Sequence, residues 1–324
     1  MASPPTESTQ SLDLKKRFFR INTLIALVVS LAIVYLFIRR FDIGEALSVL
    51  SRLDFSVYLI AAAVFYLSLP LRGDRWLRLL GDAGVRLPLF ALCRYYFFAW
   101  FANCILPARI GDLYRAYLLK KNHGQSFSMS IGVLFTEKIF DLSTTLVLVL
   151  LGGAFYFGKI GDPAVRTALA RGIIILAAFV MVLALLAWRS KAIQRLIPDR
   201  LRRIYGSFSE GLLKSPRLIP VITIESFIIW LSEALRFYLV CLALGIKIDF
   251  LLAVFISQAA LVLMSLPLTP AGLGLVELLM FTLLGQAGFS GDRAAAAIIA
   301  DRLISFWSLI ILGGVHYLFS PRIR

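Results

Sequence analysis

Long runs of apolar residues fill most of this chain and restrict the folds that it can adopt. A soluble globule could not coat so much apolar surface, because 60% of the residues are hydrophobic and only 16% are charged. Each run is about as long as one membrane-crossing helix, near 20 residues. The sequence therefore predicts an all-α integral membrane protein with about eight transmembrane helices. The runs cover 21–38, 56–71, 88–106, 127–151, 171–188, 218–244, 250–268 and 295–319.

The N-terminal segment 1–20 is polar and then basic, which predicts a disordered tail ahead of the first helix. The run at 21–38 has no small-residue cleavage site after it, so we expect a retained helix rather than a signal peptide. The basic tail favours a cytoplasmic N-terminus by the positive-inside rule. The segment 189–217 is also basic, yet a count of eight crossings places it on the opposite side of the membrane from the tail.

Two segments interrupt the apolar pattern with proline and glycine. One lies at 106–119 and the other at 266–277. Irregular backbone at membrane depth is tolerated only where protein or a water-filled cavity satisfies its polar groups. Both segments therefore predict a broken or re-entrant helix, and the sequence leaves open whether they re-enter or cross.

Four landmarks recur at a nearly constant spacing, which predicts an internal repeat. The offsets are 160 or 161 residues (301 − 141 = 160 and 236 − 75 = 161). We expect one repeat at 21–160 and a second at 161–324, each with one broken segment. An even number of crossings per repeat gives both the same orientation, and an odd number inverts one of them. Chance matching between leucine-rich helices is the alternative. The matched landmarks are Arg75-Trp76 with Arg236-Phe237, Gly84 with Gly245, Leu106-Pro107 with Leu266-Pro267, and Asp141 with Asp301.

Ionisable residues inside the apolar runs are the first candidates for a functional site. A charge at a helix centre costs about 2.5–3.5 kcal/mol on insertion scales, so such residues face the bundle interior or a cavity. Glu137 and Asp141 are four residues apart and share one helix face. Such charges either form ion pairs that hold the helices together or line a polar path for a headgroup or a coupling ion. The remaining charges of this kind are Glu225, Glu233, Arg236, Asp301 and Arg302.

The broken segments supply groups that suit an anion. Helix N-termini present unpaired N–H groups and a partial positive charge, and transporters place such ends near the membrane midplane. The alternative is that the prolines kink helices and the glycines allow close packing. The predicted substrate-binding residues are Arg109, Gly111, Asp112, Arg115, Glu137, Asp141, Pro270, Gly272, Gly274, Glu277, Asp301 and Arg302.

Other classes of function receive no support from the sequence. It contains no nucleotide-binding, zinc-protease or nucleophile-elbow motif, so we expect no catalytic residue and no cofactor. The cysteines lack metal-ligand spacing, and His123 and His316 are far apart, so no metal site is predicted. The chain has a net charge of +15, and the Lys and Arg residues that give rise to it mostly flank the apolar runs. This placement predicts contact with anionic lipid headgroups rather than with nucleic acid.

These motifs resemble the transmembrane region of the lysylphosphatidylglycerol synthases, a flippase-like membrane family. The most specific matches are the Leu-Pro-x-Arg-x-Gly-Asp pattern at 106–112 and Pro-x-Gly-x-Gly-x-x-Glu at 270–277. Arg75-Trp76, the stretch 137–141 and Asp301-Arg302 follow the family's order as well. The resemblance implies about eight spans and a role in handling lipids, such as aminoacylated phosphatidylglycerol or polyprenyl-linked sugars. Since the sequence ends at Arg324, it implies a free-standing member without the aminoacyl-transferase domain.

The leading hypothesis is a lipid translocator of a bacterial inner membrane. Arg109, Arg115 and the half-helix at Gly272 and Gly274 would hold an anionic headgroup. Its path would be lined, or the arginines neutralised, by Glu137, Asp141, Glu277 and Asp301. One alternative is an ion-coupled carrier of a small solute. Another is a non-transporting partner of a lipid-modifying enzyme or glycosyltransferase, which docks on 189–217. The sequence predicts membrane lipids as partners and leaves the oligomeric state open.

Overall fold

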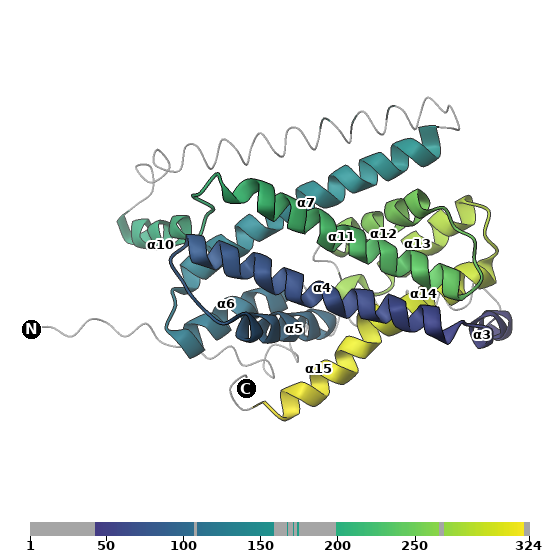
Figure 1. Cartoon of the computed structure of the whole chain (residues 1–324), viewed down its shortest axis with the longest axis horizontal. Helices are drawn as coiled ribbons and strands as arrows, with labels where there is room; N and C mark the ends of the chain where they lie inside the picture. The colour runs from purple at the N-terminus through teal and green to yellow at the C-terminus, as the bar shows by residue number, and fades with distance from the viewer. Residues whose placement is uncertain are drawn as a thin grey trace, which may run out of the picture.

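The computed structural model describes residues 43–106, 109–158, 199–265 and 269–320, together with the single positions Thr167, Arg171 and Ile174. All regular elements within these residues are helices (Figure 1), which confirms the all-α prediction. The predicted tail at 1–20, the run at 21–38 and nearly all of the run at 171–188 lie outside the described residues.

Four of the described helices are long and apolar enough to cross a membrane, namely α4, α7, α11 and the continuous helix Gly291–Leu318. The helices α5, α12 and α13 are apolar but shorter. In chain order the elements are α3 (Ile43–Ser51), α4 (Phe55–Asp82), α5 (Leu89–Ile105), α6 (Ile110–His123), α7 (Phe127–Gly158), α10 (Asp199–Glu210), α11 (Leu218–Ala243), α12 (Phe250–Ser265), the 3₁₀ turn η2 (Pro270–Gly272), α13 (Leu275–Gln286), α14 (Gly291–Arg302), the π-helical turn η3 (Leu303–Trp307) and α15 (Ser308–Leu318).

Two elements differ from the sequence-based expectation. The helix α4 continues to Asp82, well beyond the apolar run at 56–71, because Arg72 and Arg75 find buried acidic partners and need not end it. The sequence also predicts a loop at 189–217, whereas 199–210 of that segment form α10. The apolar residues of this helix recur at the spacing of an amphipathic helix, a pattern that a search for continuous apolar runs does not detect.

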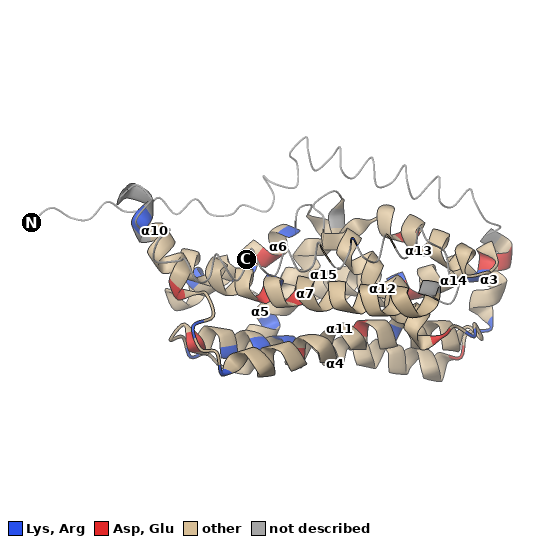
Figure 2. Ribbon diagram, turned by 90° about the horizontal axis from the view of Figure 1, so that it is seen from above, with Lys and Arg blue, Asp and Glu red and all other residues tan. Residues whose placement is uncertain are grey.

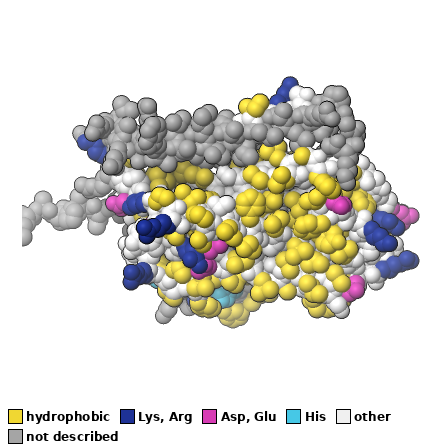
Figure 3. Space-filling view, turned by 45° about the horizontal axis from the view of Figure 1, so that its top comes forward, with side chains coloured by type: hydrophobic (Ala, Val, Ile, Leu, Met, Phe, Trp, Pro, Cys, Tyr) yellow, Lys and Arg dark blue, Asp and Glu magenta, His cyan; other side chains and the backbone are white. Residues whose placement is uncertain are grey.

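The long helices α4 and α11 lie side by side in one layer and run in opposite directions (Figure 2). The N–H of Asp54, just before α4, donates to the carbonyl of Ala243 at the end of α11 (2.7 Å). At the other end, the N–H of Lys214, ahead of α11, donates to the carboxylate of Asp82 (2.7 Å). Apolar side chains cover the middle of the face shown in Figure 3, and most of its Lys and Arg side chains lie toward the two ends. That distribution is typical of a membrane-embedded protein.

The pair α5 and α6 forms a helical hairpin, and α12 and α13 form a second one. The first hairpin has its open end near α10, and the second has its open end near α3, at the opposite end of the molecule (Figure 1). At the tips lie Arg109 (φ 52°) and Ala271 (φ 47°), the only non-glycine residues with positive φ in the described ranges. The tips meet where the Arg109 guanidinium donates to the hydroxyl of Ser265 (3.5 Å). Both broken segments are therefore hairpin tips.

The first hairpin depends on close packing at Gly111. A Cβ added there would lie 2.1 Å from the carbonyl oxygen of Ala99 and 2.6 Å from the side chain of Asn103. We expect Gly111→Ala to destabilise the protein by about 3 kcal/mol, since overpacking of this kind forces backbone shifts. Gly81→Ala in α4 is the matched control, because nothing lies within 4 Å of its added Cβ. Thermal unfolding in detergent should show a lower unfolding temperature for Gly111→Ala and not for Gly81→Ala. An equal decrease in both variants would contradict this interpretation.

Candidate functional site

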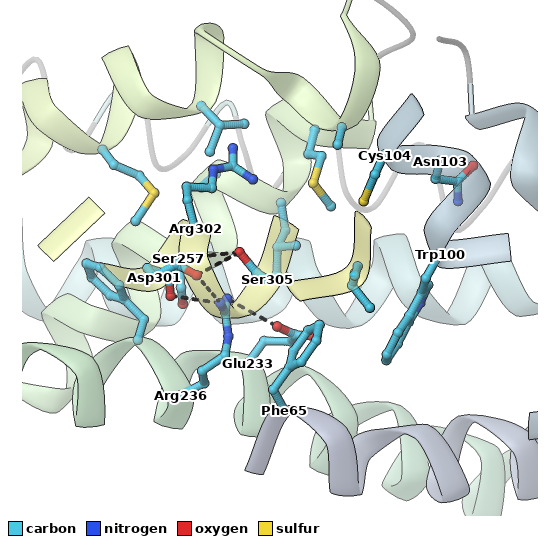
Figure 4. Close-up of a pocket in the computed structure, with 18 of the residues that line it drawn as sticks. Phe65, Trp100, Asn103, Cys104, Glu233, Arg236, Ser257, Asp301, Arg302 and Ser305 are labelled. Carbon is cyan, nitrogen blue, oxygen red and sulfur yellow. Dashed lines mark hydrogen bonds and ion pairs between the residues drawn. The ribbon is translucent and has the colours of Figure 1, made fainter. Parts of the chain in front are cut away.

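Four buried charges form a chain of ion pairs between α4, α11 and α14, which we call the quartet. Arg72 contacts Glu233 (2.8 Å), and Glu233 contacts Arg236 (3.3 Å). Arg236 in turn contacts Asp301 (2.8 Å), as Figure 4 shows. Each of these side chains is less than a tenth exposed. Its two positive and two negative charges balance, so the quartet buries no net charge.

A second set of ion pairs surrounds Glu137, which is fully buried. Its carboxylate accepts hydrogen bonds from the hydroxyl of Tyr96 (2.6 Å) and from Arg115 through both oxygens (3.1 and 3.2 Å). Arg75 lies 3.4 Å from it and 2.8 Å from Asp141. These contacts link α4, α5, α6 and α7, which explains why so many charges are tolerated in one apolar bundle.

The same set extends to the tip of the first hairpin through Asp112. This carboxylate contacts Lys138 (3.1 Å), Arg109 (3.3 Å) and Arg115 (3.9 Å). Lys138 also lies 3.7 Å from Asp141. We call the complete set the network, and its members are Arg75, Arg109, Asp112, Arg115, Glu137, Lys138 and Asp141.

Glu277 connects the second hairpin to α14. It accepts the N–H of Gly274 (2.6 Å), which caps the start of α13, and it contacts Nε of Arg302 (2.7 Å). Arg302 points away from the ion pair between Arg236 and Asp301 (Figure 4). The guanidinium is therefore held at one edge by Glu277 while its other edge faces the space between the helices.

Two cavities meet at the hairpin tips. The first, which we call the arginine cavity, has a volume of about 120 Å³ and is lined by four arginines and two carboxylates. The second, which we call the lysine cavity, has a volume of about 440 Å³ and includes Lys138, Asp112 and Asp141 in its wall. Arg109, Trp230 and Leu261 line both cavities and separate them. The charged residues of the arginine cavity are Arg72, Arg109, Arg236, Arg302, Glu233 and Asp301.

The structure divides the predicted site residues between cavity walls and buried contacts. Arg109, Asp301 and Arg302 line the arginine cavity, whereas Asp112 and Asp141 line the lysine cavity together with Arg109. Each of these five residues lines at least one cavity, and Arg109 lines both.

The other predicted residues lie behind the cavity walls or shape the backbone. Arg115 and Glu137 are fully buried and line neither cavity. Gly272 (φ 71°) and Gly274 (φ 87°) form the turn ahead of α13, and Glu277 caps it. Gly111 packs α6 on α5, as described above. Pro270 begins η2, but its side chain lies outside the described residues.

Sequence reasoning missed Arg72, Lys138 and the aromatic pair Trp100 and Trp230. The guanidinium of Arg72 lies over the rings of Trp100 (5.3 Å) and Trp230 (4.8 Å), so two aromatic rings stabilise its charge. The sequence did contain one signal for Arg72, because Arg72 and Glu233 are 161 residues apart, which equals the offset of the predicted repeat. Within the described residues, no group of three or more His, Cys, Asp or Glu side chains is arranged to hold a metal ion.

Comparison with known proteins places these features in a family. Residues 23–313 match the family model described as the lysylphosphatidylglycerol synthase TM region. The chain belongs to this family. The match confirms the resemblance found in the sequence motifs and shows, with the apolar helices, an integral membrane protein.

Three relatives from archaea illustrate the range of this family. A UPF0104 membrane protein of Methanocaldococcus jannaschii is 32% identical over 225 residues, which cover 68% of this chain and 95% of the relative. A UPF0104 membrane protein of Pyrococcus horikoshii is 22% identical, with 89% and 94% covered. Glycosyltransferase AglD of Haloferax volcanii is 28% identical over 99% of this chain, which spans only 58% of that relative.

Proposed function

We propose that this protein moves lipids between membrane leaflets and that the arginine cavity holds the headgroup. The observation that carries the proposal is the wall of that cavity, where four arginines face two carboxylates between the tips of two helical hairpins. A headgroup must cross apolar surroundings along a polar path, and arginine is the residue that best matches phosphate oxygens. Family membership supports a lipid-related role.

The proposed translocator consists of two inverted repeats, with the boundaries 21–160 and 161–324 expected from the sequence. The antiparallel arrangement of α4 and α11, the hairpins that enter from opposite ends, and the strained residue at each tip all support this arrangement. The helices α5 and α12 contain 17 and 16 residues. They are about 25 Å long, shorter than a hydrocarbon core of ~30 Å, so each hairpin is proposed to re-enter rather than cross. Each repeat then crosses the membrane an odd number of times.

Re-entrant hairpins also remove the conflict between the two basic segments. Four crossings, at 21–38, α4, α7 and 171–188, would separate the tail from 189–217 and place both on the cytoplasmic side. In a cysteine-free background, we expect Ser11→Cys and Arg217→Cys to react with a membrane-impermeant maleimide from one side of the membrane. Ser290→Cys, ahead of α14, should react from the other side. Labelling of Ser11→Cys and Arg217→Cys from opposite sides would restore the count of eight crossings.

Reconstitution tests the function itself. Purified protein in liposomes should exchange fluorescent phospholipids between leaflets faster than protein-free vesicles, with rates that depend on the headgroup. Anionic, zwitterionic and cationic lipids are compared in parallel. Absence of exchange for every lipid, from protein shown to be folded, would contradict the proposal and favour an ion-coupled carrier of a small solute.

A second candidate function is support of a glycosyltransferase that uses a lipid-linked substrate. The alignment of nearly the whole chain with part of a relative named glycosyltransferase AglD favours it. The basic segment 189–217, which contains α10, would provide the docking surface. Loss of a co-purifying glycosyltransferase on removal of the α10 charges would support it. The placement in a bacterial inner membrane stays a prediction, since the relatives named above are archaeal.

A further inference from the structure

The two cavities lie in opposite halves of the molecule. The lysine cavity is lined mostly by α6 and by positions 131–145 of α7, a stretch that begins beside α10, where Gly132 packs against Phe208. The arginine cavity is lined mostly by α11, the second hairpin and positions 301–309. In Figure 1, α6 lies toward the end of the bundle at α10, whereas α13 and α14 lie toward the end at α3. A group that moves from one end to the other therefore passes through both cavities in turn.

The wall between the cavities is thin. Among the described residues, the cavities share Arg109 from the tip of the first hairpin, Trp230 from α11 and Leu261 from α12. Trp230 has the largest side chain of the three, and the residue is only 6% exposed. The contact of Arg109 with Ser265 is long, at 3.5 Å, so it holds this part of the wall only weakly. The indole of Trp230 is thus the main barrier between the two cavities.

The indole is held by one charged group from each cavity. Its Nε1–H donates to the carboxylate of Asp141 (3.0 Å), which lines the lysine cavity. Its ring lies 4.8 Å from the guanidinium of Arg72, which lines the arginine cavity. The main chain is held separately, because Gln258 donates to the carbonyl of Trp230 (2.8 Å). The ring can therefore change rotamer while α11 stays in place.

We propose that Trp230 is a gate between the two cavities and that its hydrogen bond to Asp141 keeps the gate closed. When this bond breaks, the indole leaves the wall and the cavities join into one passage beside Arg109. The inference rests on the proposed function, because it takes the two ends of the bundle as the two faces of the membrane. A closed gate keeps these faces unconnected between transport events, which prevents a leak through the polar interior.

Accessibility of two reporter cysteines tests the gate without any lipid assay. Cys104 lines only the arginine cavity and is used in a Cys93→Ser/Cys241→Ala background. Thr145→Cys lines only the lysine cavity and is used with Cys104→Ala added to that background. The full chain is studied in right-side-out and inside-out membrane vesicles. The rate at which a membrane-impermeant, sulfonate-bearing methanethiosulfonate reagent modifies each reporter is measured from each face.

With Trp230 present, we expect the two reporters to react from opposite faces. Trp230→Phe keeps an aromatic ring but lacks the N–H group, and it should raise the rate from the far face about tenfold, the effect of losing one hydrogen bond to a charged group. Trp230→Ala should let each reporter react from both faces at similar rates. Trp307→Ala is the matched control, because Trp307 is 50% exposed and lines neither cavity.

Unfolding temperatures of the same preparations show which variants are folded, and Trp230→Phe alone suffices for the test if Trp230→Ala does not fold. Far-face rates that stay unchanged in folded Trp230→Phe would overturn the gate, and so would reporters that react from the same face in the presence of Trp230. Lipid exchange in liposomes separates the two proposals. A Trp230-dependent change of access without lipid exchange would retain the gate and reject lipid translocation, whereas exchange without that change would do the reverse.

Discussion

Glu137→Ala is expected to destabilise the protein by about 3–5 kcal/mol, the range for removal of one partner from a buried ion pair. The fully buried carboxylate of Glu137 is the direct partner of Arg115. Among the described residues, Arg115 would then retain Asp112 at 3.9 Å and the rings of Trp76 and Tyr96. Arg75 would keep Asp141. Thermal unfolding in detergent, followed by intrinsic fluorescence, measures the loss.

A control and a compensating variant make this expectation specific. Asp74→Ala breaks a pair in which Arg78 is 42% exposed, and we expect a change below about 1 kcal/mol. The double variant Arg115→Met/Glu137→Met should regain most of the stability lost in Glu137→Ala, because apolar replacements leave no charge unpaired. If Glu137→Ala unfolds at the same temperature as Asp74→Ala, the network does not hold the helices together.

Arg109→Gly is expected to reduce leaflet exchange of an anionic phospholipid by at least about tenfold while leaving the folded state intact. The side chain of Arg109 lines both cavities, so on the proposed function its guanidinium contacts the headgroup. Its backbone lies at φ 52°, a conformation that glycine adopts without strain. The loss of contacts with Asp112 and Ser265 is thus offset by relief of that strain.

The measurement pairs the exchange rate in liposomes with the unfolding temperature of the same preparation. Arg78→Ala removes an arginine of similar exposure outside both cavities and should leave exchange unchanged. If folded Arg109→Gly exchanges lipid at the wild-type rate, Arg109 does not lie on the transport path. That result would also contradict the assignment of the headgroup to these cavities.

The breaks in the helices were predictable from sequence, but their partners were not. Proline and glycine cluster at 106–112 and 270–274 and identify both hairpin tips, because several such residues close together disfavour a continuous helix. The spacing of Glu137 and Asp141 predicts one shared helix face. It does not predict that Arg75 and Arg115 contact that face, since this depends on how α4 and α6 pack on α7.

The end of α4 also depends on tertiary contacts that the sequence does not predict. Arg72 and Arg75 follow Pro70 and predict the end of an apolar run, whereas the helix continues because Glu233 and Asp141 neutralise these arginines. Those partners lie on α11 and α7, far away in the sequence. The predicted internal repeat gave one sequence signal of that contact, because its offset of 161 residues relates Arg72 to Glu233.

The position of Arg109 in the wall of both cavities has a consequence for stoichiometry. A guanidinium drawn toward an anion on one side is withdrawn from the other side, so the two cavities are not independent binding sites. On the proposed function, a second anion competes for the charge that the first has taken. We therefore expect titrations to saturate at one lipid per chain, and headgroups to pass this point in single file.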